Sequence, residues 1–177
     1  VTPETIADLL VQRGYFEAIT YSFVDPALQA VLCPGEPALG LANPISADLA
    51  QMRVSLWPGL VRALLENQRR QQPRVRLFEI GRKFLPDGGS LTEVNAVAAI
   101  AAGPAMPEQW GAPHADVDFF DVRSDVEALL RTTGSLHLFS FVPAEHAALH
   151  PGQAARILRD GRPVGWIGRL HPEIERR

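Results

Sequence analysis

The sequence predicts an α+β domain in which helices flank an antiparallel sheet. Short runs rich in β-branched or alternating residues meet in hairpin turns, and amphipathic helical runs lie irregularly between them. The clearest hairpin signals are Asp160-Gly161, a two-residue turn, and Pro86-Asp87-Gly88-Gly89. A chain of 177 residues is long enough to bury one substantial core. We therefore expect a single domain over residues 1–177.

Four helices carry start signals or an apolar stripe. Thr2-Pro3-Glu4 provides an N-cap, a first-position proline and a first-turn acid, and Gly14 provides the stop. Asp25-Pro26 begins a short helix. The most regular helix covers Trp57 to Gln71 and should end before Pro73. Its expected stripe is Leu60, Val61, Leu64 and Leu65, and that of a later helix, Asp118 to Arg131, is Val122, Val126, Leu129 and Leu130.

Strands are expected where apolar residues alternate or β-branched residues gather. The segments are 15–23, 74–84, 94–102, 136–142, 154–159 and 163–170. Pro34 and Pro37 mark a loop after the second helix, and residues 103–115 form another. At the C-terminus His171-Pro172-Glu173 opens a further helix. Because the chain begins at Val1 and stops inside that helical turn, we expect it to be excised from a longer polypeptide.

Composition restricts the class of protein. The chain is 46% hydrophobic and 21% charged, as in ordinary globular proteins. Its net charge of −3 gives no general basic field for nucleic acid. The single cysteine, Cys33, excludes an internal disulfide and favours a reducing compartment, which we take to be the cytoplasm. No apolar run approaches the roughly 20 residues of a membrane-spanning helix.

Candidate sites for chemistry have simpler alternatives. His146 and His150 have the i, i+4 spacing of helical metal ligands, but prolines bracket them and no third ligand is near. The acids at 116, 118, 121 and 125 lack the spacing of a calcium loop and suit a helix N-terminus. Neither Cys33 nor Ser55 has the neighbours of a nucleophile, and Gly88-Gly89 is a turn, not a phosphate loop.

A basic cluster has three interpretations. Its members are Arg69, Arg70, Arg74, Arg76, Arg82 and Lys83. These side chains could contact RNA phosphates, or they could form a solvated or interface surface. A third arrangement, a buried Glu79 paired with one of these arginines, is equally compatible with the sequence.

Two long runs carry a resemblance to a known family. They are NPISADLAQMRVSLWPGLVRALLENQRRQ, residues 43–71, and RVRLFEIGRKF, residues 74–84. With these runs, and with matching segments over most of the chain, the sequence resembles the catalytic-like core domain of the β subunit of bacterial phenylalanine–tRNA ligase. The resemblance implies the fold of class II aminoacyl-tRNA synthetases: an antiparallel sheet flanked by helices.

The departures from the class II pattern decide what function the resemblance implies. Active members carry an arginine and a nearby acid in the second motif, which hold ATP. This sequence has Leu85, Pro86 and Asp87 there, so the fixed cation is absent and the proline should disturb the strand. Gly165 and Gly168 match the glycine-rich third motif, but no helix with its arginine is recognisable. The resemblance therefore implies a domain that has kept the fold and lost the chemistry.

We therefore expect a non-catalytic scaffold without catalytic, cofactor-binding or metal-binding residues. By resemblance, the partner is an α subunit in an (αβ)2 heterotetramer, which would use ATP and magnesium to attach phenylalanine to its tRNA. The predicted subunit-interface residues are Trp57, Leu60, Leu64 and Asn67, and those for tRNA contact are Arg69 and Arg70. Two alternatives remain: a tRNA-contacting RNA-binding module, and a residually active ATP-dependent ligase domain.

Overall fold

The computed structural model describes residues 1–88, 90–111 and 115–176. The chain divides into two compact units, each described by itself below. One unit is formed by Tyr15–Ala101, and the other combines Val1–Gly14 with Ala102–Arg177. The expectation of a single domain over residues 1–177 stays a prediction.

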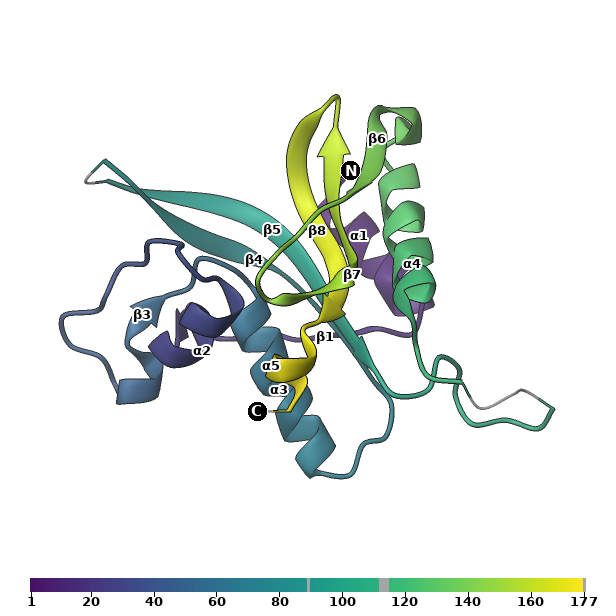
Figure 1. The fold of residues 1–177 in the computed structure, drawn as a ribbon, viewed down its shortest axis with the longest axis horizontal. Coiled ribbons are helices and arrows are strands. Elements are labelled where there is room, and N and C mark those ends of the chain that lie inside the picture. Colours follow the sequence, from purple (N-terminus) through teal and green to yellow (C-terminus); the bar gives the residue numbers. More distant parts are fainter. Residues whose placement is uncertain (89, 112–114, 177) are drawn as a thin grey trace. The chain divides into compact units, whose positions relative to one another are not determined.

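The unit of residues 15–101 contains two small sheets (Figure 1). Strands β1 (Phe16–Glu17), β4 (Val75–Asp87) and β5 (Ser90–Ala102) form the first, with β4 in the centre. Strand β1 runs parallel to β4, whereas β2 (Phe23–Val24) and β3 (Gln51–Met52) form an antiparallel pair. The neighbouring strands β4 and β5 confirm the expected hairpin. Its predicted turn includes Gly89, which lies outside the described residues.

Two sequence-based expectations for these strands were wrong. The segment 15–23 is not one strand, because its backbone pairs with β4 over only two residues and then bonds to a side chain: Thr20 N donates to Glu79 Oε1. Pro86 does not disturb β4, which continues to Asp87. Pro86 is the second-last residue of β4 and lies beyond the residues that pair with β1, Leu77 and Phe78, so the missing N–H affects only the end of the strand.

Helices α2 (Pro26–Leu32) and α3 (Trp57–Arg69) complete this unit, with a 3-10 turn η1 (Ala47–Leu49). The Asp25 side chain caps α2 as the sequence predicted. Helix α3 packs against β4. It ends at Arg69, earlier than the expected Gln71, because Gln71 adopts a left-handed backbone with φ 60°. The unit's fully buried side chains include Tyr15, Leu32, Leu56, Leu60 and Phe78.

The second unit is a three-stranded antiparallel sheet covered by a helix (Figure 1). The sheet order is β6 (Phe139–Pro143), β7 (Leu149–Arg159) and β8 (Arg162–Leu170). Asp160 and Gly161 connect β7 to β8 with φ values of 49° and 74°, which confirms the two-residue hairpin turn. Residues 136–138, expected to begin a strand, form the 3-10 turn η2 (Leu136–Leu138) instead.

Helix α4 (Phe119–Arg131) covers one face of this sheet. Its Val122, Val126 and Leu130 pack on a buried cluster of Ala155, Ile157 and Ile167, as the helical spacing predicted. Asp118 and Asp121 form a capping box at its start. Helix α1 (Pro3–Gln12), capped by Thr2, lies against α4, and a short helix α5 (Pro172–Glu175) follows β8. The α+β class is confirmed, and β1 and β4 form a parallel pair within it.

No helix in the described part of the chain is long and apolar enough to cross a membrane.

Candidate functional site

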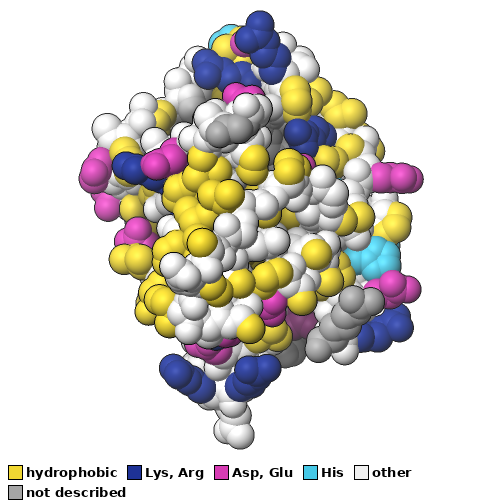
Figure 2. Space-filling view, turned by 90° about the vertical axis from the view of Figure 1, so that its left-hand side faces the viewer, with side chains coloured by type: hydrophobic (Ala, Val, Ile, Leu, Met, Phe, Trp, Pro, Cys, Tyr) yellow, Lys and Arg dark blue, Asp and Glu magenta, His cyan; other side chains and the backbone are white. Residues whose placement is uncertain are grey.

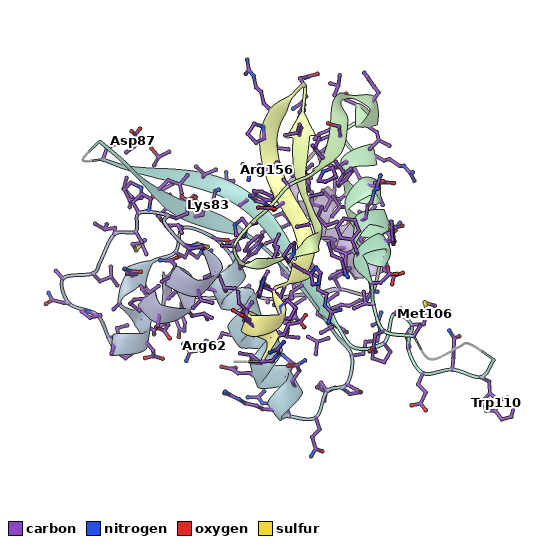
Figure 3. All side chains as sticks on the ribbon, viewed as in Figure 1. Arg62, Lys83, Asp87, Met106, Trp110 and Arg156 are labelled. Atoms are coloured by element: carbon purple, nitrogen blue, oxygen red, sulfur yellow. The ribbon has the colours of Figure 1, made fainter. Side chains whose placement is uncertain are left out.

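The end of β4, where active class II enzymes hold ATP, carries no replacement cation at position 85. Leu85 is partly buried, and Asp87 is exposed at the end of the strand (Figure 3). The neighbouring Arg82 is paired with Glu93 at 2.7 Å, and both of these side chains are largely exposed. An exposed, neutralised guanidinium is a poor substitute for the fixed cation that phosphoryl chemistry requires.

On β8, the segment that matches the glycine-rich third motif, packing explains why position 168 is a glycine. A Cβ on Gly168 would lie 2.8 Å from the Gln153 carbonyl oxygen, so only glycine permits β7 and β8 to approach this closely. The adjacent Arg169 donates two hydrogen bonds to Glu175 on α5, at 3.0 and 3.1 Å. The hydrogen bonds and charge of Glu175 raise the pKa of Arg169. This guanidinium is therefore occupied within the chain.

The histidines and acids that suggested metal sites have other roles. His146 and His150 lie outside any helix, and their Nδ1 atoms accept backbone N–H groups of Ala148 and Gly152. Asp125 pairs with Arg13 at 2.6 Å. Within residues 1–88, 90–111 and 115–176, no group of three or more His, Cys, Asp or Glu side chains could hold a metal ion.

The basic cluster is not one surface. Arg76 is buried with its guanidinium over the Tyr15 ring, and Arg74 is half-buried. Burial, reinforced by the charge of Arg76, lowers the pKa of Arg74. Arg69 and Arg70 are exposed at the C-terminal end of α3, where the sequence analysis proposed tRNA contact. That contact stays a prediction.

The four residues predicted for the subunit interface occupy two different environments on α3. Leu60 and Leu64 are 1% and 8% exposed, so they support the helix from inside the unit. Trp57 and Asn67 are half-buried, and the Asn67 amide donates to the Ala63 carbonyl oxygen. Any partner that meets α3 would contact the second pair and exposed neighbours such as Leu65. The interface role of all four residues stays a prediction.

A prominent exposed apolar surface in this unit lies instead on the segment that follows Tyr15. Phe16, Ile19 and Tyr21 are 72%, 91% and 70% exposed. The three lie within six residues of one another, and large apolar side chains exposed so close together in the chain suggest a surface that a partner covers. Figure 2 shows hydrophobic side chains gathered on the face of the molecule that it draws.

A buried ion pair fixes the backbone beneath this exposed segment. Arg53 and Glu79 are each 3% exposed, and Arg53 Nη1 lies 2.7 Å from Glu79 Oε1. Thr20 Oγ1 donates to Glu79 at 2.7 Å and accepts from Arg53 at 3.0 Å. Arg53 N also donates to the Ser22 carbonyl oxygen. The large apolar side chains are thus exposed on a backbone that is tied to the core.

A rigid apolar surface suits protein binding, because little conformational entropy is lost when a partner covers it. The sequence analysis did not identify Phe16, Ile19 and Tyr21. Ile19 and Tyr21 share the odd positions of segment 15–23 with Tyr15, which is 2% exposed, so alternation along the segment does not distinguish them from core residues.

The family model and the curated relatives that match this sequence agree on one family. The family model described as "Phenylalanyl tRNA synthetase beta chain CLM domain" matches residues 2–177. The phenylalanine–tRNA ligase beta subunit of Pseudomonas fluorescens is 56% identical over 166 residues, which are 94% of this chain and 21% of that protein. The beta subunit of Vibrio cholerae is 49% identical over 175 residues, 97% of this chain and 22% of that protein. The chain thus spans about a fifth of these relatives' length.

Solved structures support the fold. A pyrrolysyl-tRNA synthetase structure from Desulfitobacterium hafniense has a TM-score of 0.66 at 16% identity, covering 92% of this chain and 53% of that one. A second structure of that organism's pyrrolysyl-tRNA synthetase has a TM-score of 0.62 at 17% identity, covering 91% and 55%. At such low identity the likeness shows a shared class II synthetase-like fold and nothing about shared chemistry.

Proposed function

The chain belongs to the family of phenylalanyl tRNA synthetase beta chain CLM domains, and from this premise we propose that it is a non-catalytic scaffold and subunit-interface domain of a phenylalanine–tRNA ligase. The observation that carries the proposal is the exposure of the apolar side chains Phe16, Ile19 and Tyr21 on a backbone fixed by the buried Arg53–Glu79 pair. Leu85 in place of the ATP-binding arginine supports the non-catalytic part.

The proposed partner is the ligase's α subunit, in an (αβ)2 heterotetramer that works in the cytoplasm. In that assembly the α subunit carries the active site, and the holoenzyme uses ATP and magnesium to join phenylalanine to its tRNA. This chain would bind neither cofactor. It would contribute a preformed apolar surface that binds the α subunit. The half-buried Trp57 and Asn67 of α3 would extend that surface.

The experiment is co-elution of this chain with separately purified α subunit on a sizing column with light scattering. We expect a stable mixed complex that Ile19→Asp weakens at least about tenfold, because a charge would be buried in the contact. Ile45→Asp is the matched control, since Ile45 is 84% exposed elsewhere in the same unit. Failure of the wild-type chain to bind, or equal losses from both variants, would contradict the proposal. Melting curves of each variant check folding.

The second candidate function is tRNA contact through Arg69 and Arg70, which is favoured by their exposure at the end of α3. Changing both to Ala should then lower tRNA affinity and flatten its salt dependence. An unchanged affinity and salt slope would remove this candidate. The ligase-domain alternative predicts saturable binding of ATP with magnesium by the chain, and Leu85 argues against that result.

A further inference from the structure

The sheet β6–β7–β8 has a second face, opposite the one that α4 covers. Ala155, Ile157 and Ile167 point toward α4, so the residues that alternate with them point the other way. The strand register places Arg156 between Val142 on β6 and Trp166 on β8, in one row across the sheet. Arg156 therefore lies on the central strand of this face (Figure 3).

Aromatic contacts hold the Arg156 guanidinium in place. It lies over the Trp166 ring, 4.4 Å from the ring centroid. The Trp166 ring is in turn contacted edge-on by His146, with centroids 5.0 Å apart and an interplanar angle of 70°. Stacking on tryptophan fixes a guanidinium without using its N–H groups, all of which point outward in its own plane.

The hydrogen-bonding state of Arg156 differs from that of three other arginines in this unit. Arg13, Arg123 and Arg169 each have a carboxylate within 3.0 Å. For Arg156, no residue in the described ranges accepts a hydrogen bond or forms an ion pair. A half-buried, stacked guanidinium with open donors is preorganised for a planar anion, since two parallel N–H groups match two carboxylate oxygens.

We propose that Arg156 anchors a carboxylate side chain of the α subunit, with Val142 and Trp166 forming an apolar surround. This inference rests on the proposed function and adds a second contact with stated partner chemistry. Arginine and tryptophan together are typical of the energetic centre of protein interfaces. Val142 is 44% exposed, so the partner carboxylate should be flanked by apolar groups.

The charge around Arg156 favours a protein carboxylate over an RNA phosphate backbone. Arg156 is the only cation in its row across the three strands, and Glu145 is exposed near the end of β6. A polyanion needs several cations along its path and would be repelled by that acid. A single carboxylate needs only one guanidinium.

The test measures binding of this chain to purified α subunit by isothermal titration calorimetry. Arg156→Gln should weaken the dissociation constant about tenfold or more, and Arg156→Lys should recover only part of the loss, because lysine keeps the charge without the planar pair of donors. Arg159→Gln is the matched control: Arg159 is on the same strand and also lies over an aromatic ring, 5.7 Å from the Phe139 centroid. The Arg159→Gln variant should bind the α subunit with wild-type affinity.

A second readout identifies the carboxylate. Carbodiimide labelling of the α subunit should find one carboxylate that wild-type chain protects and the Arg156→Gln variant leaves open. Wild-type affinity in Arg156→Gln, equal losses in the two Gln variants, or competition by inorganic phosphate or tRNA would overturn the inference while leaving the interface function intact. Self-association of the chain through this face, lost in Arg156→Gln, would also overturn it. No binding by the wild-type chain would overturn both proposals.

Discussion

The Arg53 guanidinium and the Glu79 carboxylate lie 2.7 Å apart, and only 4% of each side chain is exposed. Arg53 also donates from Nε to the Arg82 carbonyl oxygen at 2.8 Å. The pair thus joins β4 to the segments around Thr20 and Arg53, which are distant in sequence. At this depth each charge depends on the other, because water cannot replace a missing partner.

Removing one member of the pair should be far more costly than removing a surface ion pair. Glu79→Gln keeps the side-chain shape but leaves Arg53 uncompensated, and we expect a loss of about 3–5 kcal/mol in the free energy of unfolding. Arg82→Gln breaks the exposed pair with Glu93 and should cost less than about 1 kcal/mol. Urea denaturation of both variants measures the difference. Similar losses would show that burial does not govern the strength of the Arg53–Glu79 pair.

Gly81 should be intolerant of a side chain because of the same pair. A Cβ there would lie 2.6 Å from Arg53 Nη2, whose guanidinium is held by hydrogen bonds and cannot easily move aside. We expect Gly81→Ala to cost about 1–3 kcal/mol, seen as a lower melting temperature. Gly165→Ala is the control, since a Cβ there would meet Ile157 at an ordinary 3.5 Å. Equal melting temperatures for the two variants would show that Arg53 can be displaced.

This network also shows how far the sequence alone leads. The sequence left open a buried Glu79 paired with an arginine of the basic cluster. Glu79 is buried in an ion pair, but the expected partner was wrong: it is Arg53, which does not belong to that cluster. A strand pattern indicates which side of β4 Glu79 occupies, but the segment that covers that side depends on tertiary packing. For the same reason residues 18–22 were assigned to a strand: their bonds to Glu79 and Arg53 come from residues distant in the chain.

Helix α3 illustrates the same limit for the candidate site. Its existence followed from local spacing, and Leu60, Val61 and Leu64 of the expected stripe are buried. The fourth expected member, Leu65, is 41% exposed, so that part of the prediction was wrong. Periodicity does not say whether such a stripe faces the chain's own sheet or another subunit. The exposed side chains Phe16, Ile19 and Tyr21 were missed because a strand assignment for segment 15–23 does not say which of its apolar residues are buried.

A charged substitution should destabilise the chain much more at one of two adjacent leucines of α3 than at the other. Leu64 is 8% exposed, so Leu64→Asp would bury a carboxylate without a partner and should cost about 3 kcal/mol or more. Leu65 is 41% exposed, so Leu65→Asp should change the stability of the isolated chain by less than about 1 kcal/mol. Denaturant unfolding of the isolated chain distinguishes them. A stable Leu64→Asp chain that fails only in assembly would mean that Leu64 acts at the interface.

The buried thiol of Cys33 should make stability fall in alkaline solution. Burial raises its pKa from 9.0 to about 11, opposed in part by a hydrogen bond from Ser55. Between pH 9 and 11 the unfolded chain therefore releases this proton while the folded chain keeps it. The folded state then binds more protons, so the free energy of unfolding must decrease as pH rises through this window.

Comparison of the wild-type chain with Cys33→Ala isolates this effect from the titration of other groups. The stability difference between the two proteins should be constant below pH 8 and shift in favour of Cys33→Ala from pH 9 to 11. Alkylation by iodoacetamide gives an independent check at pH 8, where a pKa raised by two units leaves about 100-fold less thiolate in the folded chain than in urea. Parallel stability curves, together with equal alkylation rates, would mean that the Cys33 thiol is open to solvent.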